Sequence, residues 1–309
     1  MKKRSELLSI VLIILLLVMP LAGCNKNNDH VYTPSSNPFD REITDARYRL
    51  NHGVIEPDPE SQSLIYAGTP VTLTYMMDNE GTAAEWGIVI YVNGFQQPFS
   101  IDGSNEVKNC HIINMEEGEK KNCKIQFIPI QGKAGEDFTV YIATILKPSY
   151  QVKGDSLDWG YFHSYGQAVP LHLVIEKDVP AQDVDLDCKT LTGEYNEQFP
   201  YWAHHSNTTE IEISDGYDAV YAEADRDITL DIAVSGRESL NYRLAIFIDH
   251  KLVPALDGNK YYNIATQKDK MLRLKIKLPY SEVKDGKFIY GVLIPLVEEY
   301  SITAPPIRK

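Results

Sequence analysis

The sequence has few cysteines, a deficit of basic residues and none of several common enzyme motifs. Among 309 residues there are only 4 cysteines, and 30 Lys and Arg face 43 Asp and Glu, which gives a formal net charge of −13. A chain this acidic has no basic surface for nucleic acid. Gly-x-Ser-x-Gly, the phosphate-binding glycine loop, Cys-x-x-Cys and His-Glu-x-x-His are all absent from the sequence. We therefore expect no enzymatic activity, no cofactor and no nucleic-acid partner.

Long apolar runs are also scarce, and the one that exists lies at the start of the chain. It follows the basic residues Lys2, Lys3 and Arg4 and extends from Leu7 to Ala22. A membrane-spanning helix needs about 20 apolar residues, so this run is slightly short. The pattern is typical of a secretory signal peptide, and we expect the rest of the chain to be exported.

The apolar run ends in Leu21-Ala22-Gly23-Cys24, which resembles the lipobox of bacterial lipoproteins. The resemblance implies that residues 1–23 are removed and that Cys24 is lipidated, because a thiolate is the nucleophile for lipid transfer. Two acyl chains make membrane attachment stable. Residues 24–44 are polar and rich in turn formers, which predicts a flexible tether on the extracytoplasmic face of the cell membrane.

Downstream of residue 48 the apolar residues recur with the period of a β-strand. In "ITLDIAV" (228–234) and "LRLKIKL" (272–278) every second residue is apolar, as in a strand with one solvated face. In contrast, "GIVIYV" (87–92) and "LAIFI" (244–248) are apolar on both faces, as expected of central strands. Helical spacing with caps is hard to find. The sequence therefore predicts an all-β fold.

One short pattern occurs twice, about 150 residues apart: "QQPFSIDG" (96–103) and "KLVPALDG" (251–258). The apolar runs on either side of it recur in the same order, over roughly 75 residues in each half, which indicates a duplicated unit. We interpret the repeated stretch as a structural turn in which Gly103 and Gly258 adopt positive φ.

Short strands between turns, in units of about 130 residues, predict two β-sandwiches. The pattern resembles the immunoglobulin-like modules of bacterial surface proteins. We expect the first sandwich at 45–178 and the second at 194–309, joined by a polar linker at 179–193.

Lipidation of Cys24 leaves three cysteines. Cys110 and Cys123 flank a hairpin-like stretch with its tip near Glu117-Gly118. If their strands pair, a disulfide would stabilise the fold by about 3 kcal/mol. The alternative is two small buried side chains, and Cys188 is left without a partner in either case.

The linker contains an acidic pattern that matches the carboxylate spacing of a calcium loop. Asp183, Asp185, Asp187 and Glu194 occupy positions one, three, five and twelve of such a loop. However, Cys188 replaces the glycine of the sharp bend, and no flanking helices are evident. A solvated acidic linker explains the same residues.

Two aromatic clusters interrupt the strand pattern on either side of the linker. The candidate ligand-binding residues are Trp159, Tyr161, Phe162, Tyr165, Tyr201 and Trp202. Aromatic side chains on polar loops stack on sugars or fill a partner's pocket, and they also serve to pack two modules together.

These features favour a membrane-anchored lipoprotein that acts as a non-catalytic binding module. Its partner would be an envelope glycan, an envelope protein or a membrane complex of which it is an accessory subunit. The alternatives are a structural spacer without a ligand site of its own and a hydrolase whose carboxylates converge only in three dimensions.

Overall fold

Alternating apolar residues form strands throughout the part of the chain that the structure describes. The computed structural model describes residues 48–58, 63–150, 168–196, 210–214, 227–236, 239–284 and 289–296. Within these ranges the only helix is α3 (Tyr280–Val283), and no helix is long and apolar enough to span a membrane. The predicted all-β class and its immunoglobulin-like sandwiches are confirmed, while Cys24, the signal peptide and the tether lie outside the described residues.

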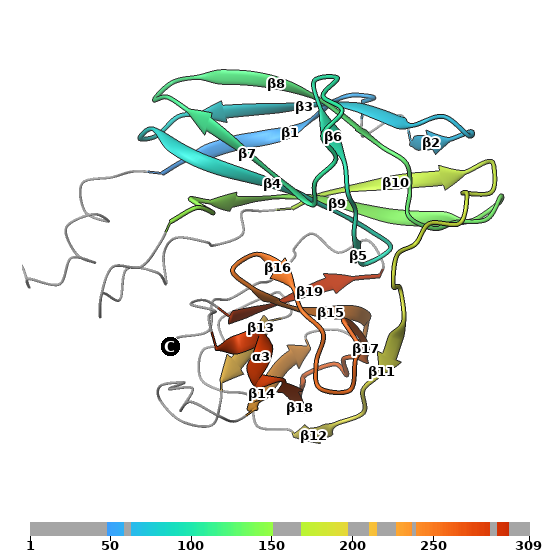
Figure 1. The fold of residues 1–309 in the computed structure, drawn as a ribbon, viewed down its shortest axis with the longest axis vertical. Helices are drawn as coiled ribbons and strands as arrows, with labels where there is room; N and C mark the ends of the chain where they lie inside the picture. The colour runs from blue at the N-terminus through green and yellow to red at the C-terminus, as the bar shows by residue number, and fades with distance from the viewer. Residues whose placement is uncertain are drawn as a thin grey trace, which may run out of the picture. The chain divides into compact units, whose positions relative to one another are not determined.

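Sandwich 1 consists of two sheets, which Figure 1 shows as two layers of strands. One sheet has the order β1-β3-β8-β6, and the other has the order β2-β10-β9-β4-β5, with β7 also paired to β4. The strands are β1 (Leu50–Glu56), β2 (Leu64–Tyr66), β3 (Val71–Asn79), β4 (Ala84–Val92), β5 (Phe95–Gln96), β6 (Ser100–Ile101), β7 (Cys110–Met115), β8 (Lys120–Phe127), β9 (Asp137–Leu146) and β10 (Val169–Ile175).

Sandwich 2 also consists of two sheets. One has the order β12-β18-β14-β13, and the other has the order β11-β17-β15-β16, with β19 also paired to β15. The strands are β11 (Cys188–Thr190), β12 (Glu194–Asn196), β13 (Glu210–Ser214), β14 (Ile228–Gly236), β15 (Asn241–Ile248), β16 (Lys251–Leu252), β17 (Tyr261–Ala265), β18 (Lys270–Leu278) and β19 (Ile289–Pro295).

The strand pairings repeat between the sandwiches, as the duplicated sequence predicts. The pairs β3–β8, β4–β7 and β4–β9 recur as β14–β18, β15–β17 and β15–β19, all antiparallel. The hairpin β4–β5 recurs as β15–β16. The repeated Asp-Gly turn is confirmed as well, because Gly103 (φ 74°) and Gly258 (φ 85°) have positive φ.

Each sandwich buries the apolar face that the period-two pattern predicts. Ile228, Leu230, Ile232 and Val234 of β14 are buried in the core of sandwich 2, and the intervening Asp231 is only half-buried. In sandwich 1, Trp86 lies at the start of the buried strand β4 and belongs to the core.

The strands that are apolar on both faces contribute to a third buried cluster. Val89, Tyr91 and Tyr141 of sandwich 1 pack in one cluster with Phe247 and Tyr290 of sandwich 2. The second apolar face of "GIVIYV" therefore contacts the other sandwich. Residues 46–309 accordingly form one compact unit.

The structure corrects the expected linker and excludes one of the two alternatives for Cys110 and Cys123. Strand β11 lies inside the expected linker 179–193 and pairs with β17 of sandwich 2. Cys110 and Cys123 are free thiols that do not face each other, because β7 pairs with β4 whereas β8 pairs with β3 of the other sheet. The turn at Glu117-Gly118 thus carries the chain from one sheet to the other. Burial raises the pKa of the Cys110 thiol to about 11.

Candidate functional site

The candidate ligand-binding aromatics of the sequence lie outside the described residues. This applies to Trp159, Tyr161, Phe162, Tyr165, Tyr201 and Trp202. Tyr195, which precedes Tyr201 and Trp202 in the sequence, is described, and it has a structural role. Its side chain packs against the core of sandwich 2, and its hydroxyl donates to Ala265 O at 2.7 Å.

A cavity of about 500 Å³ lies at one end of the β4–β7–β9 layer of sandwich 1. It is lined by Glu85 of β4, Asn114 of β7, and Lys147, Ser149 and Tyr150 that follow β9. The chain leaves this cavity directly into residues 151–167, which contain the first aromatic cluster. Tyr150 therefore immediately precedes, in the sequence, one of the segments that the sequence selects for ligand binding.

The backbone at this cavity is fixed by specific contacts. Lys147 has a positive φ of 45°, and its amide donates to Glu85 O at 2.9 Å. Its ammonium group donates to the Tyr48 hydroxyl at 2.6 Å and lies 4.5 Å from the centre of that ring. The amide of Tyr150 donates to Lys147 O at 3.0 Å. A non-glycine residue with positive φ in such a setting marks a position worth testing for function.

The neighbouring turn is held by a buried amide. Asn79 Nδ2 donates to Glu116 O at 2.9 Å and to Thr82 O at 3.1 Å. Hydrogen bonds from the Glu116 amide and from Lys121 hold the pKa of Glu119 below its usual range. Acidic, basic and amide groups thus surround the cavity beside an aromatic ring. This arrangement suits a polar ligand with one stacking surface.

A second cavity, of about 540 Å³, lies on sandwich 2 beside Gly193, Glu194 and Arg273. Lys275 also lines it and is 3.1 Å from the Asp231 carboxylate, so two of its charges neutralise each other. Gly193 is required here because an added Cβ would lie 2.1 Å from Arg273 O.

The calcium-loop hypothesis is not supported by the geometry. Among the described residues, no group of three or more His, Cys, Asp or Glu side chains converges on a common point for a metal ion. Asp185 is 3.6 Å from the Lys260 ammonium group and accepts from the Asp187 amide. Glu194 instead lies on β12, and Asp183 is exposed. The carboxylates are spread along an extended segment instead of surrounding one point.

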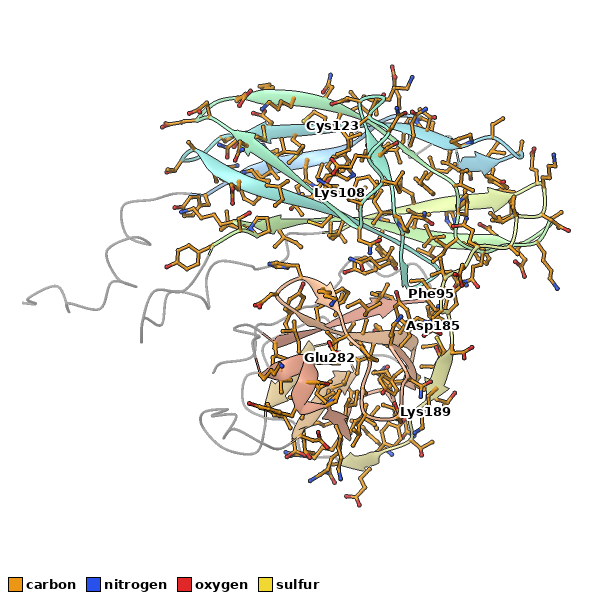
Figure 2. All side chains as sticks on the ribbon, viewed as in Figure 1. Phe95, Lys108, Cys123, Asp185, Lys189 and Glu282 are labelled. Atoms are coloured by element: carbon orange, nitrogen blue, oxygen red, sulfur yellow. The ribbon has the colours of Figure 1, made fainter. Side chains whose placement is uncertain are left out.

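Arg243 forms one polar contact between the sandwiches, and the Gln96 amide forms another by donating to the Tyr261 hydroxyl at 3.2 Å. The Arg243 side chain is 8% exposed, and its guanidinium carbon lies 3.8 Å from the centre of the Phe95 ring. The guanidinium donates to Asn93 O and, at 3.3 Å, to Asn263 Oδ1. Figure 2 labels Phe95 at this position. Gly94 is needed beside it, because a Cβ there would lie 2.8 Å from Arg243 Cβ.

Sequence reasoning missed both the Lys147 cavity and the Arg243 contact. Neither has a local pattern, since their residues come from strands that are far apart in the chain. The one available signal was Arg243 itself, a charged residue beside an apolar run that is buried on both faces.

No protein-family model and no curated protein matches the sequence. Solved structures with a similar fold include the Salmonella enterica pilin SafA in complex with the chaperone SafB, at 12% identity, covering 84% of this chain and 96% of that chain, with a TM-score of 0.25. The E. coli chaperone DraB is 10% identical, over 84% of this chain and 98% of its own, with a TM-score of 0.24. WR4, a C. elegans MSP family member, is 9% identical, over 42% of this chain and 99% of its own, with a TM-score of 0.23. At such low identity and TM-score, these similarities carry no argument about activity or partners.

Proposed function

We propose that this chain is a lipid-anchored, extracytoplasmic, non-catalytic binding protein. The observation that carries the binding function is the cavity lined by Glu85, Lys147 and Tyr150. The Tyr150 ring next to fixed charged groups suits an envelope glycan or a polar protein surface. The lipobox-like end of the apolar run supports the anchor.

The cavity is tested with Lys147→Met and Tyr150→Ala in the full chain. Each variant should weaken capture on an envelope-glycan array, or in a pull-down from intact membranes, by about tenfold or more. Lys275→Met in the second cavity is the matched control, because it removes the same charge, there paired with Asp231. Equal binding by all three variants would contradict the proposed site.

The anchor is tested separately with Cys24→Ala. The variant should lose fatty-acid labelling and should leave the signal peptide uncut or the product soluble. Labelling that remains unchanged in this variant would remove the lipoprotein assignment.

A rigid spacer is the second candidate, and the Arg243 contact favours it. A buried cation that links Asn93, Phe95 and Asn263 resists bending between the sandwiches. The spacer function predicts that Lys147→Met and Tyr150→Ala leave every partner bound, so the same binding assays separate the two functions.

A further inference from the structure

The duplicated sandwiches allow one strand edge to be compared position by position. Gly87 precedes the Asn93-Gly94 turn by the same number of residues as Arg243 precedes the Asp249-His250 turn. Gly87 is opposite Ile112 in β7, and Arg243 is opposite Asn263 in β17. The strands β7 and β17 are therefore counterparts, with Cys110 corresponding to Tyr261 and Ile112 to Asn263.

Both ends of this edge are closed by hydrogen bonds in each sandwich. At the start, Lys108 exchanges two backbone hydrogen bonds with Phe99, and its counterpart Asn259 accepts from the Ala255 amide at 2.9 Å. Figure 2 labels Lys108 at the start of β7. At the far end, a side chain binds the carbonyl oxygen: Lys121 Nζ donates to Asn114 O at 2.6 Å.

The far end of β17 has the equivalent contact, since the Tyr195 hydroxyl donates to Ala265 O, the counterpart of Asn114 O. The two edges thus agree at their first and last positions. The two edges differ between these ends, at Cys110 and Ile112 of β7 and at the corresponding Tyr261 and Asn263 of β17.

In sandwich 2 the middle of the edge is filled by β11. Its residues Cys188 to Thr190 pair in parallel with Tyr261 to Asn263, and Leu191 N donates to Asn263 O at 2.9 Å. This register directs the amide and carbonyl groups of Tyr261 and Asn263 toward β11. The Lys189 ammonium group holds β11 in place by donating to Asp257 at 2.8 Å.

In sandwich 1 no described strand lies beside the same positions. Among the described residues, β7 pairs only with β4. By the shared register, the amide and carbonyl groups of Cys110 and Ile112 face outward from the sheet. Ile112 is 47% exposed and Val107 is 62% exposed. The segment from Cys110 to Met115 contains neither Lys nor Pro, the residues that commonly protect an edge from pairing.

We propose that the edge of β7 at Cys110–Ile112 binds an extended segment of a partner protein as an added parallel strand. The inference rests on the proposed binding function and names its mode. Main-chain hydrogen bonds would supply the affinity, and alternate side chains would supply the selectivity.

The structure also indicates the chemistry of the partner segment. Side chains of an added strand on the face that carries Ile112 would meet exposed apolar surface, so β-branched or other apolar residues fit there. In sandwich 2 only three residues, Cys188, Lys189 and Thr190, pair with the edge of β17. A short extended peptide is therefore long enough to fill the gap between Lys108 and Asn114.

The test uses the chain's own edge-filling segment as the probe. A synthetic peptide of residues 184–194 with Cys188→Ser is added to the full chain, and amide hydrogen exchange is followed by NMR. Saturating peptide should slow exchange at Cys110 and Ile112 by about tenfold or more, while β17 is unchanged because β11 already covers it. A peptide with the same sequence but N-methylated at Lys189 and Leu191 should have no effect.

Two substitutions at one position complete the test. Ile112→Pro removes the outward-facing amide without removing a bond to β4, and it should abolish peptide binding. Ile112→Thr keeps the amide and a β-branched side chain, and it should retain binding. If Ile112→Pro does not fold, the N-methylated peptide provides the same comparison on the wild-type chain.

Three outcomes would overturn the inference. The first is exchange at Ile112 that is already slow without peptide, which would mean that another part of this chain covers the edge. The second is a peptide effect that maps away from β7, and the third is no effect at saturating concentration. These outcomes concern only the edge, whereas failure of the proposed function would appear in the Lys147→Met and Tyr150→Ala assays.

Discussion

Sandwich 1 and sandwich 2 share their central strand pairings but finish one strand edge differently. In sandwich 2 the edge of β17 is covered by β11, the first strand of that sandwich in the chain. In sandwich 1 the counterpart strand is β7. Among the described strands it pairs only with β4, so none of them covers its other edge. A duplicated fold therefore keeps its core and differs at an edge, which is where a strand is free to pair with a partner.

The Asp-Gly turn shows a related difference. In sandwich 1 the Asp102 carboxylate accepts from the Lys124 amide of its own sandwich at 2.7 Å. In sandwich 2 the equivalent Asp257 binds Lys189 of β11, and Figure 2 labels Lys189 on this strand. The same turn thus serves the fold in one copy and also holds the added strand in the other.

The largest effect is expected in the two matched cores. Ile90 and Ile246 occupy equivalent positions of β4 and β15 and are 0% and 2% exposed. Ile90→Ala and Ile246→Ala should each lower the free energy of unfolding by about 3 kcal/mol, because each leaves a cavity in a packed layer. Urea denaturation measures both. A loss below about 1 kcal/mol in only one variant would show that the two cores are not equivalent.

Arg243 has no counterpart side chain in sandwich 1, where Gly87 occupies its position. Arg243→Ala should cost about 2 kcal/mol, because Asn93 O loses its charged donor and Phe95 loses its cation contact. The two sandwiches should then unfold in separate calorimetric transitions. A single transition in Arg243→Ala would show that the apolar cluster and the hydrogen bond from Gln96 to Tyr261 couple the sandwiches without Arg243.

A smaller effect is expected from the contact that holds β11. Burial tends to raise the pKa of Asp257, but hydrogen bonds from Lys189, Tyr262 and Asn259 hold it well below its usual range. Its stabilisation is therefore present above the unfolded pKa of about 3.9 and is lost as the pH falls through the lower folded value. Asp257→Asn should cost about 0.5 kcal/mol at pH 7, because the pair is partly exposed.

The readout for Asp257 is the exchange rate of the Leu191 amide, which bonds to β17. In the wild-type chain this rate, corrected for intrinsic exchange, should stay constant from pH 7 to about pH 4 and rise below it. In Asp257→Asn it should be faster throughout and should lose that rise. Identical pH profiles in the two proteins would mean that Lys189 does not hold β11.

The smallest effect concerns the thiols of sandwich 1. Because Cys110 and Cys123 are free on strands of different sheets, dithiothreitol should leave the midpoint of thermal unfolding unchanged. A disulfide there would have stabilised the fold by about 3 kcal/mol, so a clear drop on reduction would contradict this arrangement.

Strand positions were predictable from the sequence because period-two alternation directly reflects one buried face. The face of β14 at Ile228, Leu230 and Ile232 is an example. Apolar residues on both faces of β4 correctly predicted a central strand, but not that its second face contacts another sandwich. The local sequence specifies that a face is buried without specifying its partner.

Pairing between distant strands was the part that the sequence did not reveal. Cys110 and Cys123 lie near each other in the chain, and only the sheet order shows that the turn between them crosses from one sheet to the other. The linker prediction failed for a similar reason. Residues 188–190 have a polar, unremarkable composition, and they become a strand because β17 offers them a free edge.

The most direct test of the edge comparison is the ratio of two amide exchange rates in the free protein, Ile112 in β7 and Asn263 in β17. The register places the Asn263 amide in the ladder with β11, and it places the Ile112 amide outward, where none of the described strands lies beside it. Ile112 should exchange faster than Asn263 by roughly a hundredfold or more after correction for intrinsic rates. Equal protection of the two amides would contradict the account, because it would show that both edges are covered.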